Sequence, residues 1–356
     1  MKSLDVPEEM KKLDPSNVLG SIGMFPDQCA DAWKNASAVV FPDSYKKAKN
    51  IVVCGMGGSR FTPRTIKELF NDTITVPYEI VDGYDLPGYV GSETLVILSS
   101  YSGSTEEVIS CATRAIEKKA LLTGMAHGGN VIELLKAQNV PFYQFDAAFN
   151  PCGQPRVGGG YLLMGHLAFL HSLGFLAIEE KEVMEAVDFA KQTGLTMNSD
   201  TLESQNPAKQ LATILFDKQP ILVVSEFMRG AVNGFANQIN ETAKMISDFR
   251  YIPELNHHFL EGLTYPESIK STLLFVFFSS HLYSQKIQKR MHITKDVVEK
   301  QHIQTHQIEL KGPTKLAQVL ESYTLGGFTT FYLAMRYDVD PVAIPWVDYF
   351  KAELGK

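Results

Sequence analysis

The chain has 356 residues, of which 45% are hydrophobic and 21% are charged, so a largely disordered protein is excluded. Its length is sufficient for about two domains. A formal net charge of −7 argues against a nucleic-acid-binding surface, and the apolar run at 273–278 is too short to span a bilayer. Residues 1–16 lack the apolar core of a secretory signal, and the four cysteines form no CxxC pair, so we expect a cytoplasmic protein.

The first half of the chain alternates predicted helices and strands. Residues up to about 47 are predicted to be helical, with a helix entry at Pro26-Asp27. The apolar, β-branched run "NIVVC" then stops at glycines, which is typical of a buried parallel strand at its carboxyl end. Further strands are predicted at 75–82, 94–102, 120–126 and 141–146, and helices at 104–119 and 129–138. This alternation predicts a right-handed parallel α/β sheet.

The second half repeats the alternation after a mostly apolar helix that begins at Tyr161. Strands are predicted at 220–227, 272–280 and 303–310, and a long helix at 315–338. We therefore predict an α/β protein of two units, 1–165 and 166–356, each a mainly parallel sheet flanked by helices in a flavodoxin-like three-layer sandwich.

The most basic stretch, residues 285–295, belongs to a predicted amphipathic helix. Ile287, Met291 and Val298 fall on one stripe of that helix, so its lysines are predicted to form a solvated face rather than a binding patch.

Two loops stand at predicted carboxyl ends of strands, where open α/β sheets bind their ligands. The first is "GMGGS" at 55–59 and the second is "SSYSGSTEE" at 99–107. In the second loop, serine and threonine hydroxyls surround Gly103 directly before a helix, which suits a phosphate monoester. The alternative is a helix N-cap, since Thr105 followed by Glu106-Glu107 is also a capping signature. The first loop lacks the spacing of a dinucleotide fingerprint, so an NAD site is not expected.

The predicted helix at 229–244 carries an unusual polar row. Ala231, Phe235, Ile239 and Thr242 form an apolar stripe, whereas Asn233, Asn237 and Glu241 follow a separate i, i+4, i+8 row. An exposed helix usually mixes lysine and glutamate on its polar face, and this row has amides and one acid. Glu241 is either a solvated glutamate or a base in a site.

Taken together, these motifs resemble the sugar isomerase (SIS) domain family, and within it the bifunctional phosphoglucose/phosphomannose isomerases. The resemblance rests on the two loops in order, on "PR-x-x-x-GY" at 155–161, on "NETAK" followed by "PELNHH", and on the closing "DPVAIPWVDYFKAEL". It extends over nearly the whole chain. It implies two SIS-type domains and a substrate phosphate held by the two loops, through Gly58, Ser59, Ser100, Ser102 and Thr105.

The resemblance also implies the catalytic groups of an aldose–ketose isomerase. Glu241 would carry the proton between C1 and C2 of the sugar, and Arg156 would stabilise charge on the enediolate. His257 would assist ring opening from the neighbouring subunit of a homodimer. Lys351 would contact the ring oxygen or adjacent hydroxyls, although an exposed lysine of a terminal helix is the alternative from the residues alone.

The expected reaction interconverts glucose 6-phosphate, and mannose 6-phosphate as a second aldose, with fructose 6-phosphate. It needs no cofactor, and no His, Cys, Asp or Glu cluster has metal-ligand spacing, so metal-free proton transfer is expected. Two departures from relatives, Arg60 in the first loop and His258-Phe259 after the histidine, put substrate preference in doubt. Alternatives are an isomerase of amino sugars or other phosphorylated sugars, and a non-catalytic sugar-phosphate-binding regulator.

Overall fold

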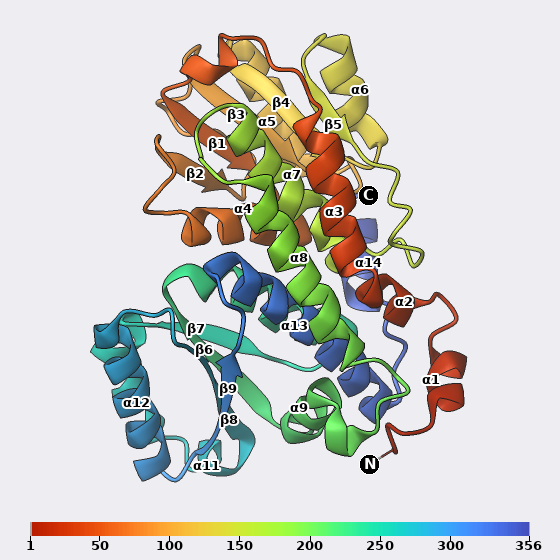
Figure 1. Cartoon of the computed structure of the whole chain (residues 1–356), viewed down its shortest axis with the longest axis vertical. Helices are drawn as coiled ribbons and strands as arrows, with labels where there is room; N and C mark the ends of the chain where they lie inside the picture. The colour runs from red at the N-terminus through yellow and green to blue at the C-terminus, as the bar shows by residue number, and fades with distance from the viewer. Residues whose placement is uncertain (1, 356) are drawn as a thin grey trace.

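The structure, a computed structural model, describes residues 2–355 and contains two parallel sheets (Figure 1). The first sheet has the strand order β2-β1-β3-β4-β5 and the second the order β7-β6-β8-β9. All strand pairs in both sheets are parallel. The predicted class, two parallel sheets flanked by helices, is confirmed.

The first half begins with three helices and then alternates strands with helices. Its elements are α1 (Pro7–Leu13), α2 (Val18–Gly23), α3 (Phe25–Ser37), β1 (Asn50–Cys54), α4 (Gly58–Leu69), β2 (Tyr78–Val81), β3 (Thr94–Ser99), α5 (Glu106–Glu117), β4 (Leu121–Ala126), α6 (Gly129–Ala137), β5 (Phe142–Gln144), α7 (Gly159–Ser172) and α8 (Glu180–Leu195). The predicted division between residues 165 and 166 falls within α7 and stays a prediction.

The second half follows the same plan with one strand fewer. Its elements are α9 (Pro207–Leu215), β6 (Gln219–Ser225), α10 (Arg229–Ala243), β7 (Asp248–Ile252), α11 (Ile269–Thr272), β8 (Leu273–Ser280), α12 (Gln285–Lys300), β9 (Gln304–Leu310), α13 (Lys315–Tyr337) and α14 (Pro345–Leu354). Short 3₁₀ turns are η1 (Tyr45–Lys47), η2 (Pro155–Val157), η3 (Glu203–Gln205), η4 (Glu226–Met228), η5 (Glu254–His257) and η6 (Phe259–Leu263). The amphipathic pattern of 285–295 is confirmed, since Ile287, Met291 and Val298 are buried.

Sequence reasoning missed β7. The strand reads "DFRYI", carries Asp248 and Arg250, and lies at the edge of its sheet, where most of its side chains are only half-buried. A central strand such as β6 is recognisable because both of its faces are covered and its residues form a continuous apolar run. An edge strand such as β7 does not need a continuous apolar run.

The apolar core runs through both halves. One cluster joins the inner face of the first sheet to α3, α7, α13 and the second sheet, and a smaller cluster lies between the first sheet and α5 and α6. In Figure 1, α13 passes between the two sheets, and almost its whole length is buried. No helix within residues 2–355 combines the length and the apolar character needed to cross a membrane.

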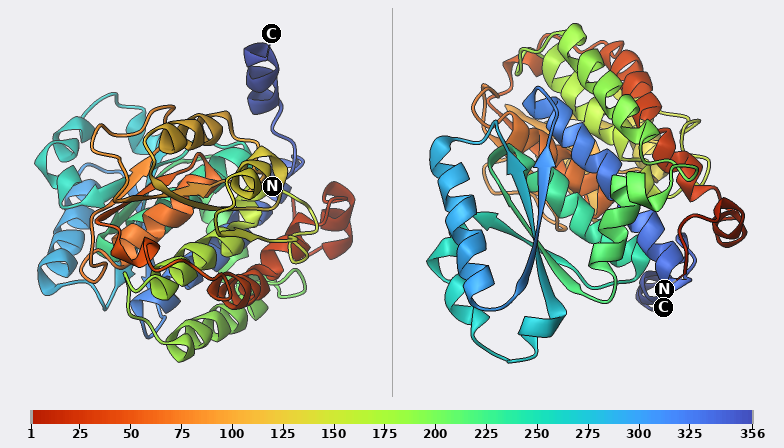
Figure 2. Two further views of the ribbon diagram at one scale, coloured as in Figure 1. Left: turned by 90° about the horizontal axis from the view of Figure 1, so that it is seen from above. Right: turned by 60° about the horizontal axis from the view of Figure 1, so that its bottom comes forward.

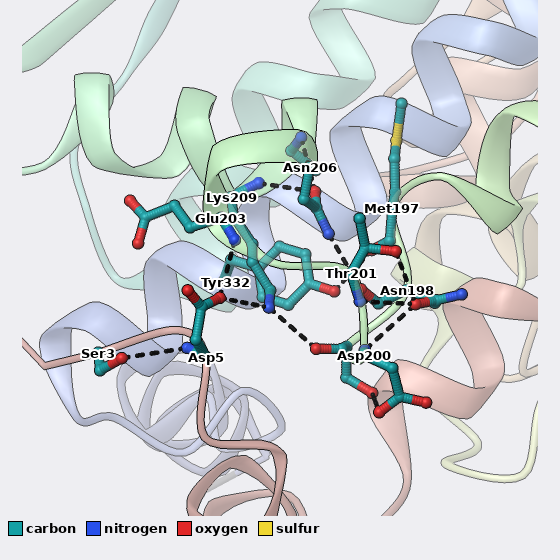
Figure 3. A network of polar contacts seen from close by, with 12 residues as sticks. Ser3, Asp5, Met197, Asn198, Asp200, Thr201, Glu203, Asn206, Lys209 and Tyr332 are labelled. Atoms are coloured by element: carbon teal, nitrogen blue, oxygen red, sulfur yellow. Dashed lines mark hydrogen bonds and ion pairs between the residues drawn. The ribbon is translucent and has the colours of Figure 1, made fainter.

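The N-terminal segment is fastened to the second half by a buried lysine (Figure 3). The Lys209 side chain is fully buried, and its Nζ donates to Asp5 Oδ1 at 3.1 Å and to the carbonyl of Ser199 at 2.9 Å. Asp5 Oδ1 also accepts from the backbone N–H of Glu203 at 2.8 Å. A buried ammonium without such partners would be strongly destabilising, so this cluster holds the N-terminal segment against α9 and the residues before it.

Candidate active site

The two loops predicted to bind phosphate follow β1 and β3, which are neighbours in the first sheet. They are tied to each other by hydrogen bonds. The Ser59 hydroxyl oxygen accepts from the backbone N–H of Tyr101 at 2.9 Å, and the Ser99 hydroxyl donates to the carbonyl of Ser59 at 2.9 Å. The sequence-predicted pair of loops therefore forms one connected surface.

Within the second loop the hydroxyls fasten the turn. Ser100 Oγ accepts from the N–H of Gly103 at 3.0 Å and lies 2.9 Å from Thr105 Oγ1. Gly103 has φ +73, and a Cβ there would lie 1.7 Å from the carbonyl oxygen of Gly128, so this turn requires glycine. The exposed Ser102 accepts from the N–H of Ser104 at 3.3 Å, which leaves its O–H hydrogen to donate to a ligand.

The helices that follow these loops begin without side-chain caps. Neither Gly57 before α4 nor Thr105 before α5 gives its helix a side-chain cap hydrogen bond. The Thr105 hydroxyl lies against Ser100 instead. The Thr105 side chain therefore does not cap α5, and the N–H groups in the first turn of α5 have no side-chain acceptor. Such groups favour an anion.

Helix α10 of the second half packs antiparallel on α4 of the first half. At Gly230 a Cβ would lie only 2.4 Å from Thr65 Cα, so a larger residue would force the helices apart. Gly234 lies against Phe61, one turn nearer the start of α4. The C-terminal end of α10, with Glu241, consequently lies beside the first loop.

Glu241 and the first loop line a common hollow of about 410 Å³. Its walls are Met56, Gly57, Arg60, Phe61, Asp82, Asn237, Asn240 and Glu241. Two members of the predicted polar row, Asn237 and Glu241, therefore face one space with the start of α4. Arg60, the residue in which this chain departs from relatives, is 2.6 Å from Asp82 through its Nε. Sequence reasoning did not find Asp82 or Asn240.

Arg156 lies next to Glu241 although the two are far apart in the chain. Its buried guanidinium has Nη1 at 3.7 Å from Glu241 Oε2, and Nη1 also donates to Gln154 Oε1 at 3.0 Å. Its Nε donates to Thr242 Oγ1 at 3.2 Å. The Arg156 backbone approaches Gly58, which joins this arginine to the first loop. The Nη1 edge is the part of the guanidinium that faces the Glu241 carboxylate.

The other end of the Arg156 guanidinium holds the segment that leads into α14. Nη2 donates to the carbonyls of Pro341 at 2.6 Å and Val342 at 2.7 Å. These contacts span about half the chain in sequence, and backbone carbonyls leave no residue-type signal, so sequence reasoning could not have found them. They fix the orientation in which Nη1 faces Glu241.

Burial raises the pKa of the Glu241 carboxyl above its usual value, and the positive charges of Arg156, Lys351 and Lys244 partly oppose this rise. A raised pKa suits a carboxylate that must accept and return a proton near neutral pH. Burial, reinforced by Arg156, lowers the pKa of Lys244 to about 8. Sequence reasoning used Lys244 only as part of "NETAK" and gave it no role.

Two residues predicted for the site, His257 and Lys351, do not line the hollow beside Glu241. His257 ends η5 and its side chain is exposed, and it is not among the residues that line the hollow. Lys351 is exposed on α14, and its charge nevertheless contributes to the Glu241 pKa. One chain therefore assembles Arg156, Glu241 and the first loop, while a place for His257 at the site stays a prediction.

Several curated proteins with similar sequences are bifunctional phosphoglucose/phosphomannose isomerases by name. The sequence model of the bacterial phospho-glucose isomerase C-terminal SIS domain matches residues 204–354. A bifunctional phosphoglucose/phosphomannose isomerase of Caldicellulosiruptor bescii is 29% identical over 94% of this chain and 98% of that protein. Over most of its length the chain is therefore similar to these isomerases. A second such relative, from Aquifex aeolicus, is 26% identical over 86% of this chain and 91% of its own length.

The fold is shared with more distant solved structures. The C-terminal domain of glucosamine-fructose-6-phosphate aminotransferase from Francisella tularensis superimposes with a TM-score of 0.72 at 12% identity. The match covers 92% of this chain and 98% of that one. At this identity the likeness concerns the fold alone.

Proposed function

We propose that this protein, a sugar-phosphate isomerase, interconverts glucose 6-phosphate and mannose 6-phosphate with fructose 6-phosphate. The observation that carries the proposal is the pair of Arg156 Nη1 and Glu241 Oε2 at 3.7 Å, beside a hollow that the first loop also lines. The similarity to named relatives supports the reaction class, since those relatives are phosphoglucose/phosphomannose isomerases.

The phosphate binds at the two loops in this proposal. Gly58 allows the ligand to approach the start of α4, and Ser59, Ser100, Ser102 and Thr105 supply hydroxyl groups. Their arrangement before two helices without side-chain caps supports this placement. Binding energy from the phosphate, which does not react, positions the carbons that do.

Glu241 is the base that moves the proton. In the open-chain aldose the Glu241 carboxylate takes the proton from C2, the C2–H electron pair forms the C1=C2 bond, and the carbonyl electrons move onto O1. A proton passes from O2 to O1, and Glu241 returns its proton to C1 as the C2 carbonyl forms. Aldoses that differ only at C2 give the same enediolate, which is why glucose and mannose 6-phosphates can share one base.

Three other groups assist Glu241. Arg156 stabilises the negative charge on the enediolate oxygens through its Nη1 edge. His257, contributed by the second chain of a homodimer, opens the sugar ring, and Lys351 contacts the ring oxygen or adjacent hydroxyls. The four cysteines without CxxC spacing support a cytoplasmic location.

A coupled assay with three substrates tests the proposal. Glucose 6-phosphate and mannose 6-phosphate should each yield fructose 6-phosphate, and glucosamine 6-phosphate should not react. Turnover of glucosamine 6-phosphate alone would instead indicate an amino-sugar isomerase. Binding of all three without turnover would indicate a sugar-phosphate-binding regulator.

A further inference from the structure

Lys244 has a backbone conformation that favours glycine. It directly follows α10, three positions after Glu241, and its φ of +55 lies in the left-handed region. Lys119 has the same φ near the end of α5, but within the described residues its side chain makes no hydrogen bond or ion pair. The side chain of Lys244 is bound to the rest of the chain, which gives a reason for a lysine at this strained position.

The Lys244 ammonium holds the segment that leads into α14. Its Nζ donates to the carbonyl of Asp340 and, at 3.0 Å, to the carbonyl of Thr242 in the last turn of α10. The next two carbonyls along the segment accept from Arg156 Nη2. Three consecutive carbonyls are therefore held by two cations that come from different elements, α10 and η2.

This segment is the attachment of α14. In Figure 2 the helix projects from the body of the molecule, and residues 340–344 lead into its first turn. Helix α14 carries Lys351, whose charge lowers the pKa of Glu241 together with the charges of Arg156 and Lys244. These three cations are thus joined through one short stretch of backbone.

The Lys244 ammonium is charged at neutral pH. Burial and the charge of Arg156 lower its pKa to about 8, and the charges of Asp340 and Glu241 oppose this shift. Lys244 also lines a second hollow of about 410 Å³, on the side of the segment 217–219. The other titratable side chains of that hollow are Asp217, Lys218 and Tyr337.

We propose that Lys244 is a positioning residue for the isomerase reaction. Its ammonium fixes residues 340–342 against the end of α10, which keeps the guanidinium of Arg156 turned toward Glu241, and its charge favours the ionised form of the Glu241 carboxyl. The proposal rests on the proposed function, in which Glu241 is the base. The clamp, by which we mean the contacts of Lys244 and Arg156 with residues 340–342, can be measured without any turnover.

The first test measures the clamp by hydrogen–deuterium exchange in the full chain. Lys244→Gly removes the side chain and places a residue that suits φ +55, so the backbone after α10 is preserved. The N–H groups of Val342 and Ala343 are bonded to the Asp340 carboxylate. We expect them to exchange at least about tenfold faster in this variant, because the carbonyl of Asp340 loses a charged donor.

Lys119→Gly is the matched control for the exchange measurement. It makes the same substitution at the same φ, and exchange at residues 342 and 343 should stay as in the natural protein. Unchanged exchange in Lys244→Gly, or an equal acceleration in both variants, would show that Lys244 does not clamp this segment.

The second test is the acid limb of the pH dependence of kcat/KM for glucose 6-phosphate. Lys244→Gly should move this limb to higher pH by about half a pH unit, since a positive charge that lowers the Glu241 pKa is lost. Lys244→Arg keeps a charged donor and should restore the natural position, and Lys119→Gly should not move it. A limb that stays in place in Lys244→Gly, or that Lys244→Arg does not restore, would overturn the role of Lys244 in the reaction.

The two tests separate this inference from the proposed function. If the natural protein turned over neither aldose 6-phosphate, the proposed function would fail, and the exchange measurement would still decide whether the clamp exists.

Discussion

The two halves of the molecule use the same loop positions in opposite ways. In the first half the loops after β1 and β3 carry glycines and hydroxyls, and α5 begins without a side-chain cap. In the second half the corresponding strands are β6 and β8, which also lie side by side. There Glu226, directly after β6, places its carboxylate 2.7 Å from the hydroxyl of Ser284, directly before α12. Glu226 Oε1 and Oε2 also accept from the Ser284 N–H, each at 3.3 Å.

The difference is the reason why we expect the substrate phosphate at only one of the two similar sheets. In the second half the Glu226 carboxylate already accepts from both the N–H and the hydroxyl of Ser284, the residue directly before α12. In the first half the corresponding position is lined by hydroxyls, a group that can donate to an anion. We therefore expect the first half to bind phosphate and the second half to contribute Glu241 on α10.

The largest effect is expected at Glu241. Replacing Glu241 by Gln should reduce kcat by about 10²–10⁴-fold, because the amide cannot accept the proton, while KM changes little. The variant should not be less stable at neutral pH. The pKa of the Glu241 carboxyl is higher in the folded protein than in the unfolded chain, so the free energy of unfolding falls as pH rises between these two pKa values. Gln does not titrate and therefore removes this loss of stability. Steady-state kinetics and denaturant unfolding check both parts; near-normal turnover would remove Glu241 from the mechanism.

Arg156 is expected to have the next largest effect. Arg156→Gln should lower kcat by about 10²–10³-fold, because one donor to the enediolate is lost. It also removes a positive charge that lowers the Glu241 pKa, so the acid limb of the pH–rate profile should move to higher pH. Arg60→Gln is the matched control. It removes a nearby guanidinium that is not among the charges lowering the Glu241 pKa, so the acid limb of the pH–rate profile of this variant should stay in place. A shift in both variants, or in neither, would contradict the assignment.

The phosphate loop should produce a smaller effect, and mainly on binding. The Ser100→Ala, Thr105→Ala double variant should raise KM by about ten- to a hundredfold, since one of these two mutually bonded hydroxyls keeps a hydrogen to donate to a charged group and that donor is lost. Ser284→Ala makes a similar change at the corresponding position of the second half and should leave KM unaltered. Equal effects of the two variants would mean that the halves do not differ in phosphate binding.

The smallest effect is expected at Glu226. Glu226→Gln should lower the free energy of unfolding by about 1 kcal/mol, because Ser284 exchanges a charged acceptor for a neutral one. Turnover should be unchanged. Thermal unfolding and the coupled assay measure these quantities, and a loss of activity without a loss of stability would place Glu226 in the substrate site instead.

Much of the fold and part of the site could be predicted from sequence because the relevant signals are local. Buried parallel strands such as β1 are continuous apolar runs that end in glycine, and the stripe of Ala231, Phe235 and Ile239 is buried as its spacing indicates. The charged edge strand β7 has no such signal and was missed. The sequence allows Thr105 to be either a helix cap or a ligand donor. Its hydroxyl contacts Ser100 and gives α5 no side-chain cap, and its donation to a ligand stays a prediction.

The unpredicted parts of the site depend on contacts between distant segments. The "GMGGS" motif does not reveal that Asp82, at the end of the neighbouring strand β2, lies beside Arg60. Nor does any motif indicate that carbonyls of Pro341 and Val342 orient Arg156. His257 was assigned by resemblance, and its role stays a prediction because one chain leaves it exposed and apart from Glu241.

The most direct measurement is the incorporation of solvent deuterium into the sugar. The natural protein is incubated with fructose 6-phosphate in D₂O, and the sugar phosphates are analysed by NMR alongside a sample with Glu241→Gln. We predict deuterium at C2 of the aldose 6-phosphates and at C1 of the recovered ketose with the natural protein, and with the variant almost none at either carbon. Rapid incorporation with the variant, or aldose formation by the natural protein in which no carbon-bound hydrogen ever exchanges, would contradict proton transfer by Glu241.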